Sequence, residues 1–94
     1  MMAFTCTIEV PRDVGEKAKL KAWLTSQRTM IAKGDALFAI LDGDQERVFC
    51  ANMPGLLAEL LVQEGVPLKS GQAIAVVWVE GEHIPYGRPY ISEL

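Results

Sequence analysis

The residues that could do chemistry in this chain are few and scattered. There is one histidine, His83, and there are two cysteines, Cys6 and Cys50, all far apart in the sequence. A metal site needs several such ligands at short spacing, and a nucleophilic site needs a base beside its nucleophile; neither pattern is present. Glu59 and Glu64 stand as separate carboxylates rather than as an acid–base pair. We therefore expect neither an enzyme active site nor a metal site.

The densest group of polar side chains lies between two apolar runs. Leu37–Leu41 and Val48–Ala51 flank the segment 42–47, DGDQER. Asp-Gly between apolar runs is typical of a tight β-hairpin, because glycine accepts the positive φ that such turns require. We predict a two-stranded arm with an entirely polar tip, residues 42–47, standing in water. The tip is either a solvated turn or a contact surface. The candidate contact residues are Asp42, Gly43, Asp44 and Gln45.

The spacing of apolar residues predicts strands along most of the chain. Phe4–Val10 alternates between apolar and polar residues, and Ala73–Val79 is rich in Val and Ile. Glu16–Leu24 and Leu56–Val62 are made mostly of good helix formers, so helix and strand compete there. In the first of these, lysines 17, 19 and 21 alternate with apolar residues, which favours a strand with a wet lysine face over an anion-binding patch. Trp23 and Trp78 are expected in the core rather than in a ligand groove.

The overall composition indicates one small domain. The chain has 94 residues, half of them hydrophobic, and a net charge of −3, which gives no basic surface for nucleic acid or an anionic membrane. No apolar run approaches the ~18 residues of a membrane span, and no secretory signal is recognised. We therefore expect a cytoplasmic protein in which Cys6 and Cys50 are free, buried thiols, with a disulfide between them as the less favoured alternative.

The two halves of the chain repeat one pattern. A shift of 37 positions places Gly34 on Gly71 and brings apolar positions onto apolar positions. Each half would expose an apolar face alone, so we predict two sheets that pack on one another about an approximate twofold axis. The further matches are Trp23-Leu24 with Leu60-Leu61, Gln27 with Glu64, Ile31 with Leu68, Asp35 with Gln72, Leu37 with Ile74, and Ala39 with Val76.

Several short motifs stand at fixed intervals along these halves. They are Pro11, Trp23-Leu24, residues 31–37 (IAKGDAL), Pro54-Gly55, Gln63-Glu64-Gly65, residues 68–71 (LKSG) and Ile74. Together they resemble the biotinyl/lipoyl-carrier domain family over about residues 5–80, with Leu68 in the family's valine place and Arg28-Thr29 where Gly-Asp is usual. The resemblance implies an all-β fold, a flattened β-sandwich (barrel-sandwich hybrid) of two four-stranded sheets with pseudo-twofold symmetry. We assign residues 1–81 to this domain and 82–94 to a C-terminal tail that covers a sheet edge or, alternatively, binds a partner.

The resemblance also implies a lysine at the hairpin tip, and this chain has none there. The family's spacing from Gly55 places Asp44 at the attachment position, and no lysine lies between Lys33 and Lys69. A carboxylate cannot form the amide that holds the cofactor, and the guanidinium of Arg47 is a poor acyl acceptor. We therefore expect no covalent cofactor. The expected role is a non-catalytic accessory or docking component of a 2-oxo acid dehydrogenase or carboxylase type complex that acts by protein contacts. The alternative is a lipoyl or biotin carrier modified at an unusual lysine, with Lys33 as the first candidate.

Overall fold

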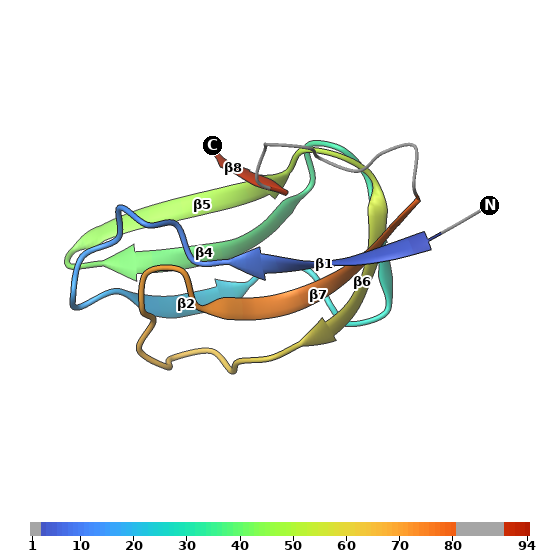
Figure 1. Cartoon of the computed structure of the whole chain (residues 1–94). Coiled ribbons are helices and arrows are strands. Elements are labelled where there is room, and N and C mark those ends of the chain that lie inside the picture. The colour runs from blue at the N-terminus through green and yellow to red at the C-terminus, as the bar shows by residue number, and fades with distance from the viewer. Residues whose placement is uncertain (1–2, 81–89) are drawn as a thin grey trace.

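The computed structural model describes residues 3–80 and 90–94 and places them in two antiparallel sheets of four strands each (Figure 1). The first sheet has the order β1-β7-β6-β3 and the second the order β2-β4-β5-β8. No helix occurs in the described residues, so the all-β prediction is confirmed, including the strand rather than the helix for both ambiguous segments. The strands are β1 (Ala3–Glu9), β2 (Lys19–Trp23), β3 (Thr29–Ile31), β4 (Ala36–Asp42), β5 (Gln45–Ala51), β6 (Gly55–Leu60), β7 (Ala73–Glu80) and β8 (Ile91–Glu93).

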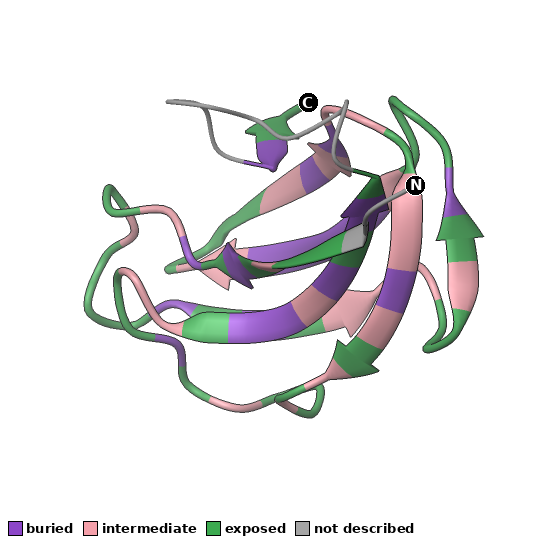
Figure 2. Cartoon of the chain, turned by 45° about the vertical axis from the view of Figure 1, so that its right-hand side comes forward, coloured by how far each residue is buried: buried purple, intermediate pink, exposed green. Residues whose placement is uncertain are grey.

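The core lies between the two sheets and is built from the inward positions of both (Figure 2). Phe38 of β4 is at its centre: its ring stacks on Phe49 at a centroid distance of 5.2 Å and meets the edge of Trp23 at 5.6 Å. These aromatic pairs fix how β2, β4 and β5 sit against one another. The largest of the fully buried side chains are Ile8, Val10, Leu20, Leu37, Phe38, Ile40, Leu57, Ile74, Val77 and Val79.

Backbone hydrogen bonds repeat at the same shift of 37 positions. The N–H of Leu24 donates to the carbonyl of Leu37, and the N–H of Leu61 donates to the carbonyl of Ile74, both at 2.8 Å. The strand order agrees, because β2-β4-β5 in one sheet corresponds to β6-β7-β1 in the other. The predicted pseudo-twofold relation therefore holds at the level of individual bonds.

Each half of the chain also donates a backbone hydrogen bond to a side chain of the other half. A carboxylate oxygen of Glu64 accepts a hydrogen bond from the N–H of Trp23, and the amide oxygen of Gln27 accepts one from the N–H of Leu60, each at 2.8 Å. Since Gln27 and Glu64 are 37 residues apart, and so are Trp23 and Leu60, each half supplies the acceptor that the other half needs. These reciprocal bonds join the two halves at the ends of β2 and β6.

Arg28 has the same backbone geometry as the glycine that stands 37 positions later. Its φ is +63°, and its counterpart Gly65 has φ +89°. The N–H groups of both residues donate at 2.6 Å, Arg28 to the carbonyl of Leu57 and Gly65 to that of Leu20. The turn therefore requires a left-handed residue in both halves, and in the first half an arginine adopts a conformation that favours glycine.

The C-terminal residues that the structure describes join the second sheet. β8 pairs with β5, with Ala51 opposite Ile91, and Leu94 donates its N–H to the carbonyl of Val48 at 2.9 Å. The Tyr90 hydroxyl donates to the carbonyl of Met53 at 2.8 Å, and burial raises the pKa of this phenol. Residues 82–89 of the tail that we assigned to 82–94, and residue 81 before it, lie outside the described residues.

The structure differs from the sequence predictions in the burial of Trp78 and in the burial of the two cysteines. Trp78 is 47% exposed rather than in the core, because its position in β7 faces outward from the first sheet. Trp23 is half-buried against the core, as expected. Cys6 and Cys50 are free and both half-buried, and desolvation raises the pKa of the Cys6 thiol.

Candidate functional site

The β4–β5 hairpin closes with a two-residue turn, Gly43-Asp44, between the paired residues Asp42 and Gln45. Gly43 has φ +68°, whereas Asp44 does not have a positive φ. A positive φ at the first central position alone is typical of a type II′ turn, which suits the twist of the strands and favours glycine there. The hairpin lies at the end of the molecule opposite the start of β1 (Figure 1). The turn therefore presents Asp44 at one end of the domain.

Three of the four predicted contact residues are exposed, and the fourth is engaged in holding the fold. Gly43, Asp44 and Gln45 are exposed. The carboxylate of Asp42 accepts hydrogen bonds from the N–H of Gly15, at 3.1 and 3.3 Å, and from Arg47 Nη1 at 3.2 Å. Asp42 thus fastens the loop after β1 to the hairpin rather than offering a free carboxylate to a partner.

The sequence led us to expect Arg47 in water, and this expectation is wrong. β5 begins at Gln45, so Arg47 lies within a strand and its side chain is only 10% exposed. It donates to Glu93 from Nε at 3.0 Å and from Nη2 at 2.8 Å, and to Asp13 from Nη2 at 3.1 Å, in addition to its bond with Asp42. Its guanidinium lies 5.5 Å from the ring centroid of Phe49.

This ion cluster has a clear electrostatic consequence. Hydrogen bonding to Glu93 is the main cause that raises the pKa of Arg47, and the same bonds lower the pKa of the Glu93 carboxyl. The cluster joins the loop after β1, the hairpin and β8 through one cation. Sequence reasoning missed it because Asp13 and Glu93 are 34 and 46 positions from Arg47; the one local signal is a charged residue just before the apolar run 48–51.

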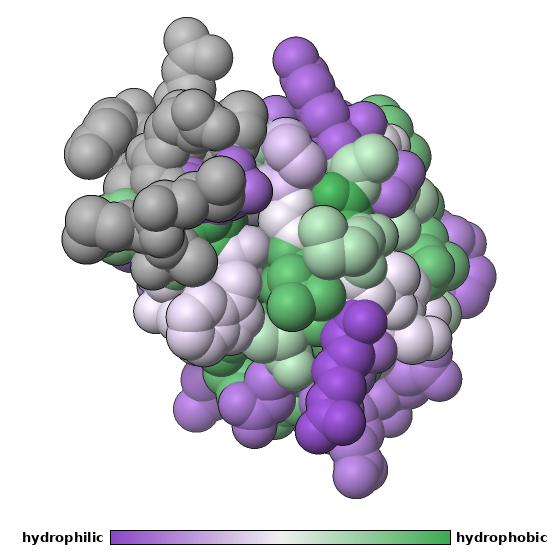
Figure 3. Space-filling view, turned by 90° about the vertical axis from the view of Figure 1, so that its right-hand side faces the viewer, coloured by the Kyte–Doolittle hydropathy of each residue, from purple (hydrophilic) through white to green (hydrophobic). Residues whose placement is uncertain are grey.

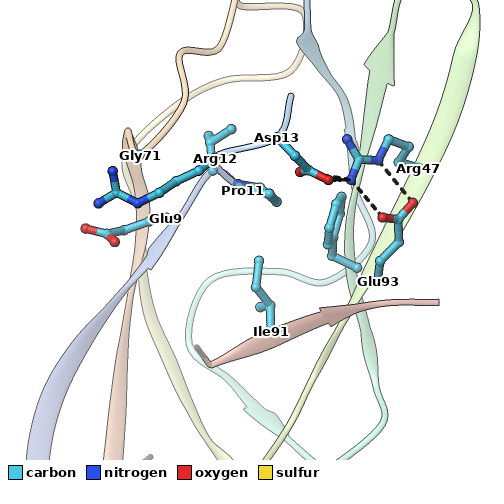
Figure 4. A pocket seen from close by; sticks show the side chains of 10 residues that line it. Glu9, Pro11, Arg12, Asp13, Arg47, Gly71, Ile91 and Glu93 are labelled. Carbon is cyan, nitrogen blue, oxygen red and sulfur yellow. Dashed lines mark hydrogen bonds and ion pairs between the residues drawn. The ribbon is translucent and has the colours of Figure 1, made fainter. Parts of the chain in front are cut away.

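A groove of about 410 Å³ opens beside this cluster, between the end of β1 on one side and β5 and β8 on the other. Its floor is apolar and its rim is charged. In Figure 4, Ile91 points up into the groove, while Arg47 is joined to Asp13 and Glu93 along one wall. The lining residues that carry charge are Glu9, Arg12, Asp13, Arg47 and Glu93.

A second surface lies on the outer face of the first sheet. Met30, Leu56 and Trp78 are register neighbours across β3, β6 and β7, and Met30 is 72% exposed. Together with Pro54 they border a shallow hollow of about 270 Å³. Figure 3 shows hydrophobic residues gathered in the middle of the face that it views, with hydrophilic residues below them and to the right. An exposed apolar row of this kind is typical of a contact surface.

The described residues contain no cluster of three or more His, Cys, Asp or Glu side chains arranged to hold a metal ion. No membrane-spanning helix is found in residues 3–80 and 90–94. The lysine proposed as an alternative attachment site, Lys33, is exposed in the turn before β4, at the opposite end of that strand from Asp42. Comparison of the chain with protein-family models, with curated proteins and with solved structures finds no match.

Proposed function

We propose that this protein is a lipoyl/biotinyl-like domain without the attachment lysine, which acts through protein contacts as an accessory or docking component of a 2-oxo acid dehydrogenase or carboxylase type complex. The observation that carries the proposal is the hairpin turn. The exposed β4–β5 turn carries Asp44, and the family resemblance expects a lysine at this position.

The chemistry of the turn excludes the swinging-arm role at that position. Attachment of either cofactor needs an uncharged amine that attacks an activated acyl group, and a carboxylate offers none. Arg47, the one basic residue of the segment 42–47, is held by three carboxylates, and its guanidinium stays protonated. What remains at the tip is a small polar surface suited to recognition.

Two surfaces support a contact role. The tip offers Gly43, Asp44 and Gln45, and the outer face of the first sheet offers the row Met30, Leu56 and Trp78. Apolar rows rimmed by polar residues are where protein partners bind, and large aromatic and Met side chains are enriched in such interfaces.

The test is the intact mass of the protein after co-expression with a lipoate ligase and, separately, with a biotin ligase. We expect the wild-type chain to keep its bare mass. Asp44→Lys should gain one lipoyl or biotinyl group, because the turn would then present an amine at the resembling position. Gln45→Lys is the matched control: it puts an amine one residue away and should stay unmodified.

Each result bears on the proposal. An adduct on the wild-type chain would overturn the contact-only role and support a carrier modified at an unusual lysine, which peptide mapping would identify. Failure of both ligases to modify Asp44→Lys would contradict the assignment of the hairpin as the counterpart of the family's cofactor-bearing turn.

A further inference from the structure

β1 is the longest open strand edge among the described residues. It is an outer strand of the first sheet, seven residues long, and β7 is the one strand of residues 3–80 and 90–94 that pairs with it. The other outer strands are protected: β3 and β8 have three residues each, and β2 carries lysines and is bridged to Pro67. β1 contains neither Pro nor Lys, and its single charged residue is Glu9 at its end. Its own sequence thus has neither the short length nor the Lys or Pro residues that often prevent an edge from pairing with another chain.

The edge of β1 leads into the groove described above. The groove begins at Glu9 and lies where β1, at the edge of one sheet, faces β8, at the edge of the other (Figure 4). Its floor consists of Val10, Phe49 and Ile91, which are 1%, 3% and 7% exposed. A volume of about 410 Å³ over such a floor has room for an apolar side chain that projects from a strand lying along β1.

The charges around the groove favour a cation. Arg47 is not free to bind an anion, because each nitrogen of its guanidinium already donates to a carboxylate. The carboxylates exceed the guanidinium groups, so a positive charge at the rim is attracted and a negative one is repelled. The charged groups at and behind the rim are the carboxylates Glu9, Asp13, Asp42 and Glu93 and the guanidiniums Arg12 and Arg47.

From these three observations we propose that β1 and the adjoining groove bind an extended segment of a partner protein. The segment adds as a further strand on the free edge of β1, where alternate N–H and C=O groups point away from β7. One of its apolar side chains lies over Phe49 and Ile91. A Lys or Arg two residues further along, on the same face of the added strand, lies against the carboxylate rim. This inference rests on the contact function proposed above and gives that function a site and a partner chemistry.

The probe for this site is a synthetic peptide, acetyl-Thr-Val-Thr-Val-Thr-Lys-Thr-amide, titrated into isotope-labelled full-length protein and followed by amide chemical shifts in NMR. We expect saturable amide shifts in β1 and in Val10, Arg12 and Asp13. The same peptide with Glu in place of Lys should bind at least about fivefold more weakly in 20 mM NaCl, and the difference should shrink in 0.5 M NaCl because salt screens the rim. Methylating the backbone nitrogens of alternate peptide residues, in either of the two possible phases, should abolish binding in one phase only.

Protein variants give a second readout. Glu9→Gln removes one rim carboxylate from an exposed position and should weaken binding of the lysine peptide about two- to threefold. Glu59→Gln removes an exposed carboxylate from β6, outside the groove lining, and should leave the affinity unchanged.

Shifts confined to β8 or to the row of Met30, Leu56 and Trp78 would overturn the proposal, as would equal binding of the Lys and Glu peptides or no binding at millimolar concentration. These failures are separable from failure of the proposed function. A covalent adduct in the mass experiment would overturn the contact-only role and leave the peptide titration intact, whereas a negative titration leaves the masses unchanged.

Discussion

Replacing Arg47 by methionine removes the cation that three carboxylates share. The Arg47 side chain is 10% exposed, and that of Asp42 is 19% exposed, so this pair is largely shielded from water. Asp13 and Glu93 are 74% and 41% exposed, so solvent screens their part of the cluster. Methionine is about as long as the aliphatic stem of arginine and keeps an apolar side chain at this position. The substitution therefore removes the charge, its hydrogen bonds and the contact of the guanidinium with the Phe49 ring.

The magnitude follows from these exposures. A shielded hydrogen bond to a charged group contributes about 1.5–3 kcal/mol, and an exposed ion pair contributes about 0–1 kcal/mol. Counting the Asp42 bond in full and the bonds to Asp13 and Glu93 as exposed pairs, we expect the free energy of unfolding to fall by about 1.5–5 kcal/mol at pH 7. For a small domain with a total of about 5–15 kcal/mol, that is a large fraction.

The loss should depend on pH. Arg47 lowers the pKa of Glu93 in the folded protein below its unfolded value of about 4.3. The stabilisation from this pair is therefore fully present above that unfolded value and disappears as the pH falls through the lower folded pKa. The difference in stability between the wild-type protein and Arg47→Met should accordingly be largest near pH 7 and smaller near pH 3.

Urea unfolding followed by tryptophan fluorescence at both pH values measures these differences. The matched control is Lys21→Met, which also removes a cation from an ion pair, but in that pair Lys21 and Glu46 are both about half exposed (48% and 47%). It should cost no more than about 0.5 kcal/mol. The reasoning is refuted if Arg47→Met destabilises the protein no more than Lys21→Met does, or if its cost is as large at pH 3 as at pH 7.

The remaining predictions use the twofold relation and the same unfolding assay. Arg28→Gly should stabilise the protein by about 0.5–1 kcal/mol, since glycine relieves the cost of a positive φ, while Gly65→Ala at the related position should destabilise it by about 1 kcal/mol; a loss of stability in Arg28→Gly would contradict this. Glu64→Gln should change stability by less than about 0.5 kcal/mol, because Gln27 fills the equivalent role in the other half. Glu64→Ala leaves the Trp23 N–H without its acceptor and should cost about 1 kcal/mol; equal effects of the two Glu64 substitutions would show that the bond contributes nothing.

Most of the fold could be predicted from the repeat in the sequence. Matching glycines and apolar positions 37 residues apart indicated two equivalent halves, and apolar alternation indicated strands where helix propensity competed. Both predictions are correct for the same reason. Strand periodicity and turn glycines are local requirements of the backbone, so they can be recognised from the types of neighbouring residues. The exposed turn at Gly43-Asp44 could be predicted in the same way. A tight turn involves only four consecutive residues, and the positive φ that it requires favours glycine at position 43.

The roles of residues whose partners lie in distant segments could not be predicted from the sequence. Asp42 and Arg47 were predicted to be solvent-exposed tip residues because their neighbours in the sequence are polar. Their hydrogen-bond partners lie in the loop after β1 and in β8, far away in the sequence. Trp78 was expected in the core because strand aromatics are usually buried, and only its register opposite Leu56 and Thr5 shows which face of β7 it occupies.

The sequence by itself determined the strand class, the twofold plan and the absence of a lysine at the hairpin, since each is written in residue types at short or fixed spacing. The tertiary structure alone decided which charges meet, which apolar side chains face outward and which strand edge stays open. Those properties arise from the pairing order of β1, β7 and β6 in one sheet and β4, β5 and β8 in the other, and pairing order brings together residues that no local pattern connects.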